Sequence, residues 1–263
     1  MKTSQVIRAL ETIAPARIAA SWDNSGWQIR HEDTNVTGML LTIDVTAGVL
    51  DEAAEAQANL IVSHHPLIFD PLKRLDLHFA NARVIAKAIK DGVSVFSMHS
   101  NLDVSPHSPS IALAELLGLV KVRFLDPLPL RAPFDVGWGA VGKLDHSISV
   151  SDLRDLIVES LQTELVRVIT ADMSQTFRSV AIGAGSLSNL IPNVLEQSVT
   201  VYITSDVKYH DAQYAVNNGL TILDVDHYYA ERPVLDKLRQ ALEPQLDIPV
   251  TVSRIPTSPP QYR

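Results

Sequence analysis

Two adjacent histidines, His64 and His65, stand between the apolar run 60–62 and Pro66. An apolar, partly β-branched run of this length is typical of a short strand buried on both faces. Because proline disfavours helical backbone in the residue before it, we expect extended or turn backbone at His65. Both imidazoles can then face a crevice at the carboxyl end of the strand, where open α/β sheets bind ligands. For His-His-Pro taken alone, a polar loop with satisfied or exposed histidines is the alternative.

Other polar side chains recur just past short apolar stretches. They are Asp44 after 39–43, His99 and Asp103 after 93–98, Asp206 and His210 after 201–204, and His227 and Glu231 after 220–225. If these strands are parallel, their polar ends converge. Imidazole and carboxylate together suit divalent metal ions, and a bridging carboxylate can hold two ions a few Å apart. The sequence therefore predicts a metal site with open positions for water, and its candidate ligands are His64, His65, Asp103, His227 and Glu231.

Glu231 follows His227 by four residues and precedes Pro233 by two. Proline is suited to the first turn of a helix. We therefore expect Glu231 at the start of the helix that follows, with its carboxylate facing inward.

The elements that would position these residues alternate between helix and strand. This alternation predicts an α/β fold with parallel or mostly parallel sheets flanked by helices. The expected helices are 4–13, 47–58, 80–90, 111–117, 151–161 with Ser151 as its N-cap, 210–217 and 234–242. The expected strands are 39–43, 60–62, 93–98, 137–144, 166–169, 179–182, 199–204 and 220–225.

A proline-rich connector, Asp126-Pro127-Leu128-Pro129, interrupts this alternation. It predicts two α/β lobes: an N-terminal lobe, 1–128, completed by 221–263, and a second lobe, 129–220. These boundaries are approximate, and the alternative is that the whole chain, 1–263, forms one domain.

The composition excludes several classes of protein. The 263 residues carry a net charge of −8 and include no cysteine, so disulfides and thiolate metal sites are excluded. The sequence contains no basic block, so we expect no extended nucleic-acid surface. The first residues lack an apolar signal core, and no window approaches the ~18 apolar residues of a membrane span. These features predict a cytoplasmic protein without a membrane segment.

Six motifs, in order and spacing, carry a resemblance to a known family. They are Trp22-Asp23-Asn24-Ser25-Gly26, Leu41-Thr42-Ile43-Asp44-Val45-Thr46, Ile61-Val62-Ser63-His64-His65-Pro66, His99-Ser100-Asn101-Leu102-Asp103, Thr204-Ser205-Asp206-Val207-Lys208-Tyr209-His210 and Asp226-His227-Tyr228-Tyr229-Ala230-Glu231. Over nearly its whole length the chain closely resembles the NIF3-like (DUF34) family, the GTP cyclohydrolase 1 type 2 homologues.

The resemblance implies a dinuclear metal site with His64, His65, Asp103, His227 and Glu231 as ligands. It also implies a toroidal homohexamer. Two divalent ions per chain, which could be Zn, Mn, Fe, Ni or Co, would lower the pKa of bound water from 15.7 toward ~7. The expected function is therefore a metal-dependent hydrolase for a small, nucleotide-like substrate; the family name suggests opening of a guanine ring at C8 with release of formate. The alternative is a non-catalytic metal-binding regulatory or metal-handling ring protein.

Several residues keep two interpretations. His99 and His210 are candidates for proton transfer, or are satisfied histidines. Asp44 either hydrogen-bonds a ligand imidazole or caps a helix. The segment 183–186, Gly-Ala-Gly-Ser, either presents N–H groups to an anion or allows close chain packing. We expect the three tryptophans, Trp22, Trp27 and Trp138, to be packing or subunit-contact residues.

The chain departs from the family pattern at Ser205 and Asp226, where glycine is usual, and at Ala230, where serine is usual. Pro106-His107-Ser108 also replaces a glycine-containing segment. All five ligand types are intact, so these departures concern substrate contacts and pocket shape.

Overall fold

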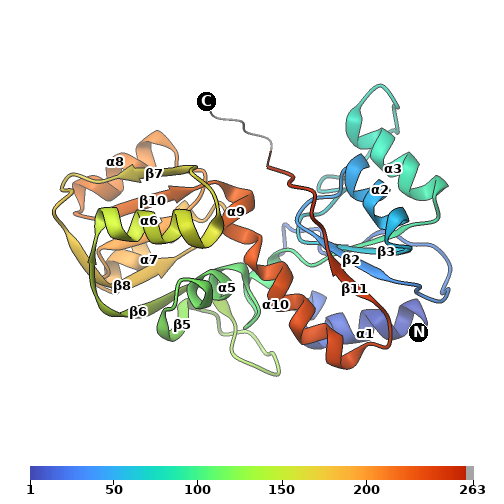
Figure 1. Ribbon diagram of the computed structural model, residues 1–263, viewed down its shortest axis with the longest axis horizontal. Helices are drawn as coiled ribbons and strands as arrows, with labels where there is room; N and C mark the ends of the chain where they lie inside the picture. The colour runs from blue at the N-terminus through green and yellow to red at the C-terminus, as the bar shows by residue number, and fades with distance from the viewer. Residues whose placement is uncertain (259–263) are drawn as a thin grey trace. The chain divides into compact units, whose positions relative to one another are not determined.

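A computed structural model describes residues 1–258 of the chain, which divides into two compact units (Figure 1). Unit 1 comprises Met1–His107 and Leu235–Thr257, and unit 2 comprises Ser108–Val234 and the segment that begins at Ser258. Each unit is built around its own sheet.

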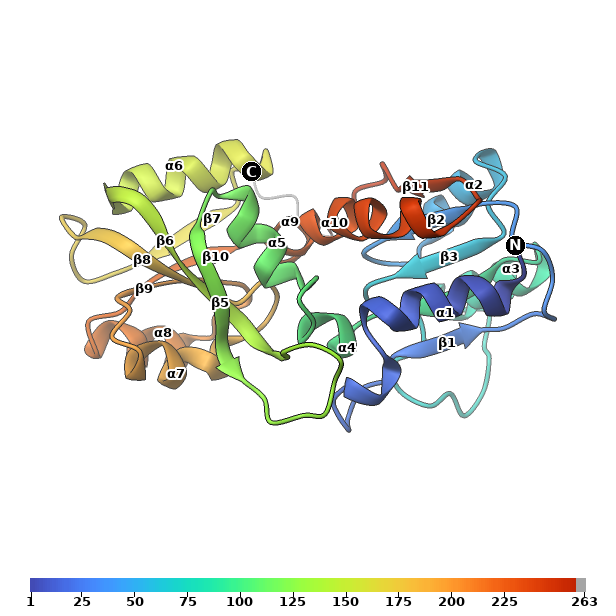
Figure 2. The same ribbon diagram turned by 90° about the horizontal axis from the view of Figure 1, so that it is seen from below.

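Unit 1 contains a five-stranded sheet in the order β1-β4-β3-β2-β11. Strands β4, β3, β2 and β11 are parallel, and β1 is antiparallel to β4. Helices α2 and α3 cover one face, while α1 and α10 lie on the other (Figure 1, Figure 2). The elements are α1 (Thr3–Ile13), η1 (Ala16–Ile18), β1 (Gly26–Ile29), β2 (Met39–Thr42), α2 (Ala47–Glu55), β3 (Leu60–Ser63), α3 (Ala80–Lys90), β4 (Ser94–Ser97), α4 (Ser100–Asp103), α10 (Pro233–Leu242), η3 (Glu243–Gln245) and β11 (Val250–Val252).

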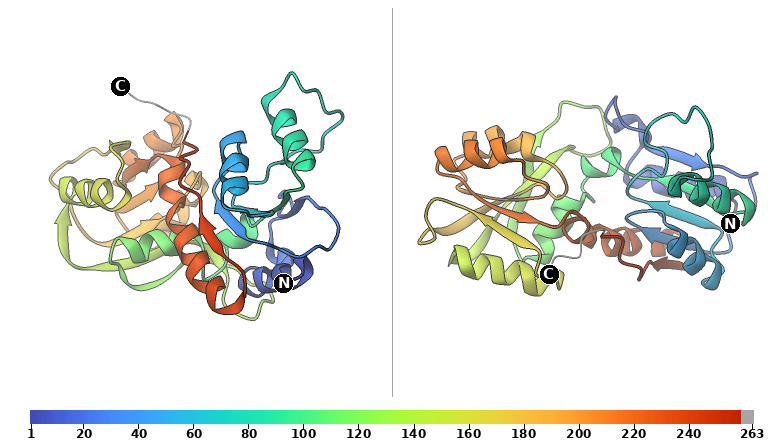
Figure 3. Two further views of the ribbon diagram at one scale, coloured as in Figure 1. Left: turned by 45° about the vertical axis from the view of Figure 1, so that its right-hand side comes forward. Right: turned by 90° about the horizontal axis from the view of Figure 1, so that it is seen from above.

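Unit 2 contains a six-stranded mixed sheet in the order β5-β6-β8-β9-β10-β7. Its β8, β9 and β10 are parallel, and the other neighbouring pairs are antiparallel. Helices α5 and α6 pack on one face, and α7 and α8 on the other (Figure 3). The elements are α5 (Pro109–Leu116), β5 (Val120–Pro127), β6 (Gly137–Ser149), α6 (Val150–Leu161), β7 (Val166–Ile169), β8 (Thr176–Ile182), η2 (Ser188–Leu190), α7 (Ile191–Glu196), β9 (Val201–Thr204), α8 (Tyr209–Asn217), β10 (Thr221–Val225) and α9 (His227–Glu231).

The predicted α/β architecture of sheets flanked by helices is confirmed. The sheet of unit 1 is mostly parallel, as expected, whereas three of the five neighbouring strand pairs in unit 2 are antiparallel. Apolar runs such as β2 and β3 are buried at every residue, as strands covered on both faces should be. The N-cap of α6 was predicted wrongly. Ser149, not Ser151, accepts from the backbone N–H of Asp152, whose carboxylate in turn accepts from the N–H of Ser149, so the two form a capping box.

The connector expected to start at Asp126 begins later in the structure. Strand β5 continues to Pro127 and pairs with β6, with Asp126 opposite Trp138. The two compact units divide at His107 and Ser108. Residues 221–234 belong to unit 2, because β10 pairs with β9 and β7. Unit 1 does take its last strand, β11, from the C-terminal part of the chain.

Across residues 1–258, no helix combines the length and apolarity that crossing a bilayer requires.

Candidate metal centre

Three histidines of unit 1 meet at the carboxyl edge of its parallel strands. His64 and His65 directly follow β3, and His99 lies just past the neighbouring β4. One ring nitrogen from each lies within 4.8 Å of the others. The loop after β3 is anchored by the Ser63 hydroxyl, which lies 2.8 Å from the His65 carbonyl and 2.7 Å from the Ser97 hydroxyl. The expected convergence of strand ends is therefore present within unit 1.

Three candidate ligand histidines and the proton-transfer candidate His99 each have an acceptor at Nδ1. Nδ1 lies 2.9 Å from the Met98 carbonyl in His64, 2.8 Å from the Asp44 carboxylate in His65, 2.7 Å from Asp23 in His99 and 2.6 Å from Asp206 in His227. An acceptor at Nδ1 favours the tautomer that carries its proton there. The lone pair is then on Nε2, which is the arrangement of histidines that bind metals.

Asp44 can now be assigned to one of its two interpretations. Its Oδ1 lies against His65, and its Oδ2 accepts from the Thr257 hydroxyl at 2.5 Å. The cap of α2 is instead Thr46, whose side chain accepts from the Val49 N–H. Asp44 therefore orients a candidate ligand imidazole rather than capping the helix.

The carboxylate of Asp103 faces the imidazole of His64. Asp103 ends the short helix α4, and its Oδ1 lies 3.5 Å from Nε2 of His64. His64 is almost wholly buried. The pair therefore places one imidazole nitrogen and one carboxylate oxygen side by side in unit 1.

A second such pair lies in unit 2, on α9. His227 and Glu231 are one helical turn apart, with 3.0 Å between Nε2 and Oε1, and Glu231 is buried. The expectation that Glu231 starts the last long helix was wrong. It ends α9, and Pro233 begins α10 as a separate helix. Asp226 accepts from the Tyr229 N–H as the N-cap of α9, which gives this departure from the family pattern a structural role.

Both donor pairs suit a divalent cation. Zn–N and Zn–O bonds are 2.0–2.2 Å long, so adjacent ligands in a tetrahedron lie about 3.4 Å apart. The separations of 3.5 Å in unit 1 and 3.0 Å in unit 2 are close to this value. Without an ion the same separations also suit charge-assisted hydrogen bonds. The Nδ1 anchors are what favour metal binding.

Gly185 provides the space for the Glu231 carboxylate. Its φ is +89°, and a Cβ built there would lie under 3.0 Å from Oε1 of Glu231 and 3.5 Å from Nε2 of His227. A Cβ on Gly183 would likewise overlap the hydroxyl of Tyr202. Both glycines of the 183–186 segment therefore permit close packing, which is the second of the two interpretations.

Asp23 is a buried carboxylate whose role the sequence did not reveal. It accepts from Nδ1 of His99 at 2.7 Å, from the Ser100 N–H at 3.0 Å and from the Ser25 hydroxyl at 2.5 Å. Burial of Asp23 opposes ionisation, but these hydrogen bonds outweigh it and hold its pKa well below the usual range. In the sequence Asp23 appeared only within the family motif 22–26, because its partner His99 lies 76 residues away.

The two candidates for proton transfer lie in different surroundings. His99 is mostly buried beside His64 and His65. His210 is exposed in the first turn of α8, with its ring 5.2 Å from that of Tyr209. Within residues 1–258, His210 joins no group of three potential metal ligands.

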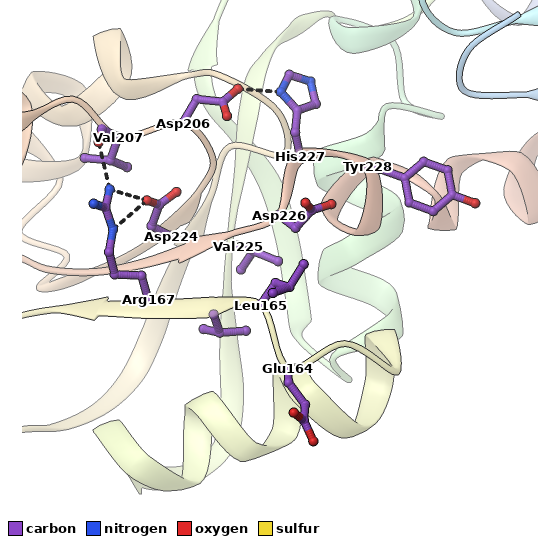
Figure 4. Close-up of a pocket in the computed structure, with 11 residues that line it drawn as sticks. Glu164, Leu165, Arg167, Asp206, Val207, Asp224, Val225, Asp226, His227 and Tyr228 are labelled. Atoms are coloured by element: carbon purple, nitrogen blue, oxygen red, sulfur yellow. Dashed lines mark hydrogen bonds and ion pairs between the residues drawn. The ribbon is translucent and has the colours of Figure 1, made fainter. Parts of the chain in front are cut away.

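A pocket of about 540 Å³ opens beside His227 in unit 2 (Figure 4). The Arg167 guanidinium on its wall donates to Asp224 and, at 2.8 Å, to the Val207 carbonyl. Burial raises the pKa of Asp224 above its ordinary value despite this guanidinium. Three more carboxylates line the pocket: Glu164, Asp206 and Asp226. With its one cation paired, the pocket is unfavourable for a polyphosphate.

Comparisons with known proteins agree over the whole chain. The model of the family Duf34/NIF3 (NGG1p interacting factor 3) matches residues 1–259. A Nostoc protein named GTP cyclohydrolase 1 type 2 homolog is 36% identical over 92% of this chain and 91% of its own length. A Clostridium perfringens protein of the same name is 31% identical over 94% and 93%. A hypothetical protein from Staphylococcus aureus has a similar structure, with a TM-score of 0.93, 28% identity and coverage of 100% of this chain and 99% of that one. From its motifs, its fold and these matches, the chain belongs to the Duf34/NIF3 family.

Proposed function

We propose that this chain is a metal-dependent hydrolase with two divalent ions bound by His64, His65, Asp103, His227 and Glu231. The observation that carries the proposal is the Nδ1 acceptor at each histidine, which leaves Nε2 as the donor. Family membership supports assigning these five residues as metal ligands. When bound, such ions would supply activated water near neutral pH.

We assign proton transfer to His99 rather than to His210. Asp23 holds the proton on Nδ1 of His99 and leaves Nε2 able to accept another. A buried carboxylate beside an imidazole also stabilises the charged ring that forms. His210, exposed on α8, has no comparable carboxylate contact among the interactions of the described residues.

The substrate that we propose is a guanine nucleotide. A Helicobacter pylori relative that is 33% identical over 87% of this chain and 86% of its own length is named GTP cyclohydrolase 1 type 2. Since the pocket beside His227 disfavours polyphosphates, the phosphate groups should lie outside it. Incubating metal-loaded protein with GTP should release formate, and the absence of formate would refute this substrate without affecting metal binding.

Metal content per chain is the primary test. Untagged wild type should contain two ions, and His65→Ala and Glu231→Ala should each contain fewer. His78→Ala is the matched control, because Nδ1 of His78 also contacts a carboxylate, Asp76 at 2.9 Å, but on an exposed loop outside the cluster. A wild type that stays metal-free after reconstitution, or an equal loss in the control, would overturn the ligand assignment.

A non-catalytic metal-binding ring protein is the second candidate, favoured by the deep burial of His64 and Glu231, which suits metal retention. Turnover of esters, phosphodiesters and nucleotides discriminates between the two. Hydrolysis abolished by Glu231→Ala supports the enzyme, whereas no turnover with tightly retained metal supports the second candidate. The homohexamer is also proposed from family membership, and sedimentation velocity of the untagged protein tests it.

A further inference from the structure

We propose that Trp22 and Phe69 form a binding subsite for a planar heteroaromatic ring beside the candidate metal centre. This inference rests on the proposed function, because the subsite would bind the ring of the substrate on which the metal centre would act. The sequence led us to expect Trp22 in packing or subunit contacts. In the single chain 61% of Trp22 and 47% of Phe69 are exposed, so Trp22 is not a packing residue of unit 1.

The two aromatic side chains border His99 within unit 1. The ring centroid of His99 lies 6.0 Å from that of Trp22 and 6.2 Å from that of Phe69, and the interplanar angles are 78° and 83°. The same histidine lies 5.4 Å from His64 and 5.6 Å from His65. His99 is therefore the element shared by the aromatic pair and the histidine cluster.

Hydrogen bonds join the two loops that carry the aromatic pair. The Asn24 side chain donates to the Ile68 carbonyl at 2.5 Å, and the Ile68 N–H donates to the Gln28 side chain at 3.0 Å. Gln28 in turn donates to the Asn24 carbonyl at 2.7 Å. Residues one or two positions from Trp22 and Phe69 are thus fixed relative to each other, so a ligand would not have to order these loops.

The same turn also fixes His99. Asp23, next to Trp22, accepts from Nδ1 of His99. A ring bound on Trp22 would therefore lie on the segment that holds the histidine assigned to proton transfer. This connection distinguishes the aromatic pair from the neighbouring exposed apolar side chains Leu72, Leu75 and Leu77.

The geometry favours a ring lying on the pair rather than between its members. Trp22 and Phe69 have ring centroids 6.3 Å apart and planes inclined by 46°. A ring inserted between them would need about 7 Å, twice the normal contact distance, and parallel planes. An exposed aromatic face instead offers offset stacking, which accepts any flat heteroaromatic ring.

The test is the binding of GMP, with ribose 5-phosphate as the matching ligand that lacks the ring. Calorimetric titration is carried out on metal-loaded protein and on protein stripped by a chelator, with metal content measured in each case. Trp22→Ala and Phe69→Ala should each weaken GMP binding by about 5- to 100-fold. Trp22→Phe should retain most of the affinity. Leu77→Ala, an exposed apolar residue on the same segment, should leave it unchanged.

Unchanged GMP affinity in both alanine variants would overturn the subsite. So would an equal loss in Leu77→Ala, or wild-type binding of GMP no tighter than that of ribose 5-phosphate. The alternative occupant of this surface is a second copy of the chain, and sedimentation velocity tests it. Dissociation of an assembly by Trp22→Ala would assign the surface to that copy and overturn the subsite. Failure of the proposed function would instead appear as a metal-free wild type. In that case the GMP titration of the chelator-stripped protein still tests the ring subsite.

Discussion

Replacing Gly185 with alanine should separate the position of the Glu231 carboxylate from the rest of the fold. A Cβ at this position would lie under 3.0 Å from Oε1 of Glu231, at a backbone φ of +89°. The substitution therefore introduces two effects, backbone strain and displacement of a buried carboxylate. Gly219→Ala is the matched control in the same unit, because its φ is +75° and nothing lies within 4 Å of the added Cβ.

The magnitudes of the two effects follow from these surroundings. An alanine in left-handed backbone costs about 1–2 kcal/mol, and both variants should show this loss. Displacing Glu231 from His227 leaves a buried polar group poorly satisfied, which costs about 1–3 kcal/mol more. Metal affinity should fall about 10- to 100-fold in Gly185→Ala, as it does when a ligand loses its orientation, and should be unchanged in Gly219→Ala.

Urea unfolding of both metal-free variants would give the difference in free energy of unfolding. Competition with a chromophoric chelator would give the metal affinity. The reasoning is refuted if Gly185→Ala binds metal as tightly as wild type and is destabilised no more than Gly219→Ala. Equal loss of metal from both variants would also contradict it, because the control leaves Glu231 untouched.

Three further predictions concern the anchors of the histidines. Asp23→Asn should lower the free energy of unfolding by about 2–3 kcal/mol, because His99 and the Ser100 N–H lose their buried carboxylate acceptor. It should also move the His99 proton from Nδ1 to Nε2 in ¹⁵N NMR spectra, and an unchanged tautomer would contradict this. Since the folded state depresses the pKa of Asp23, its stabilisation is complete above the unfolded pKa and should be lost as pH falls below about 4, whereas Asp23→Asn should lack this component of the pH–stability profile. Thr257→Val removes the hydroxyl that donates to Asp44 and should weaken metal binding several-fold, while the circular dichroism spectrum stays unchanged. Unaltered metal affinity would show that Asp44 orients His65 without the Thr257 hydroxyl.

The sequence was sufficient for the features that depend on local pattern. Apolar runs such as 60–62 identify buried strands, and polar residues just after them identify the edge where His64, His65 and His99 meet. The family motifs predicted the ligand set that we propose. In each of these cases the information lies within a few neighbouring residues.

Features that depend on distant partners were missed. Strand β11 has only three residues and is defined by its parallel pairing with β2, more than 200 positions earlier. Strand β5 ends with Asp126 and Pro127, which locally favour a connector, and its pairing with β6 decides the outcome. Asp23 is similar, since the motif of neighbouring residues that contains it does not show that its carboxylate will be buried against His99.

The order in which the strands of unit 1 are synthesised has a consequence for the nascent chain. Strands β1 to β4 belong to the first 107 residues, but β11 emerges from the ribosome only after all of the main segment of unit 2. Until then the edge of β2 has no partner on that side, and an uncovered apolar strand edge is a template for pairing with other chains. Unit 2 can therefore complete its sheet before unit 1 does. Slow translation or truncation near the C-terminus should expose aggregation-prone surface in the part of the protein that was made first.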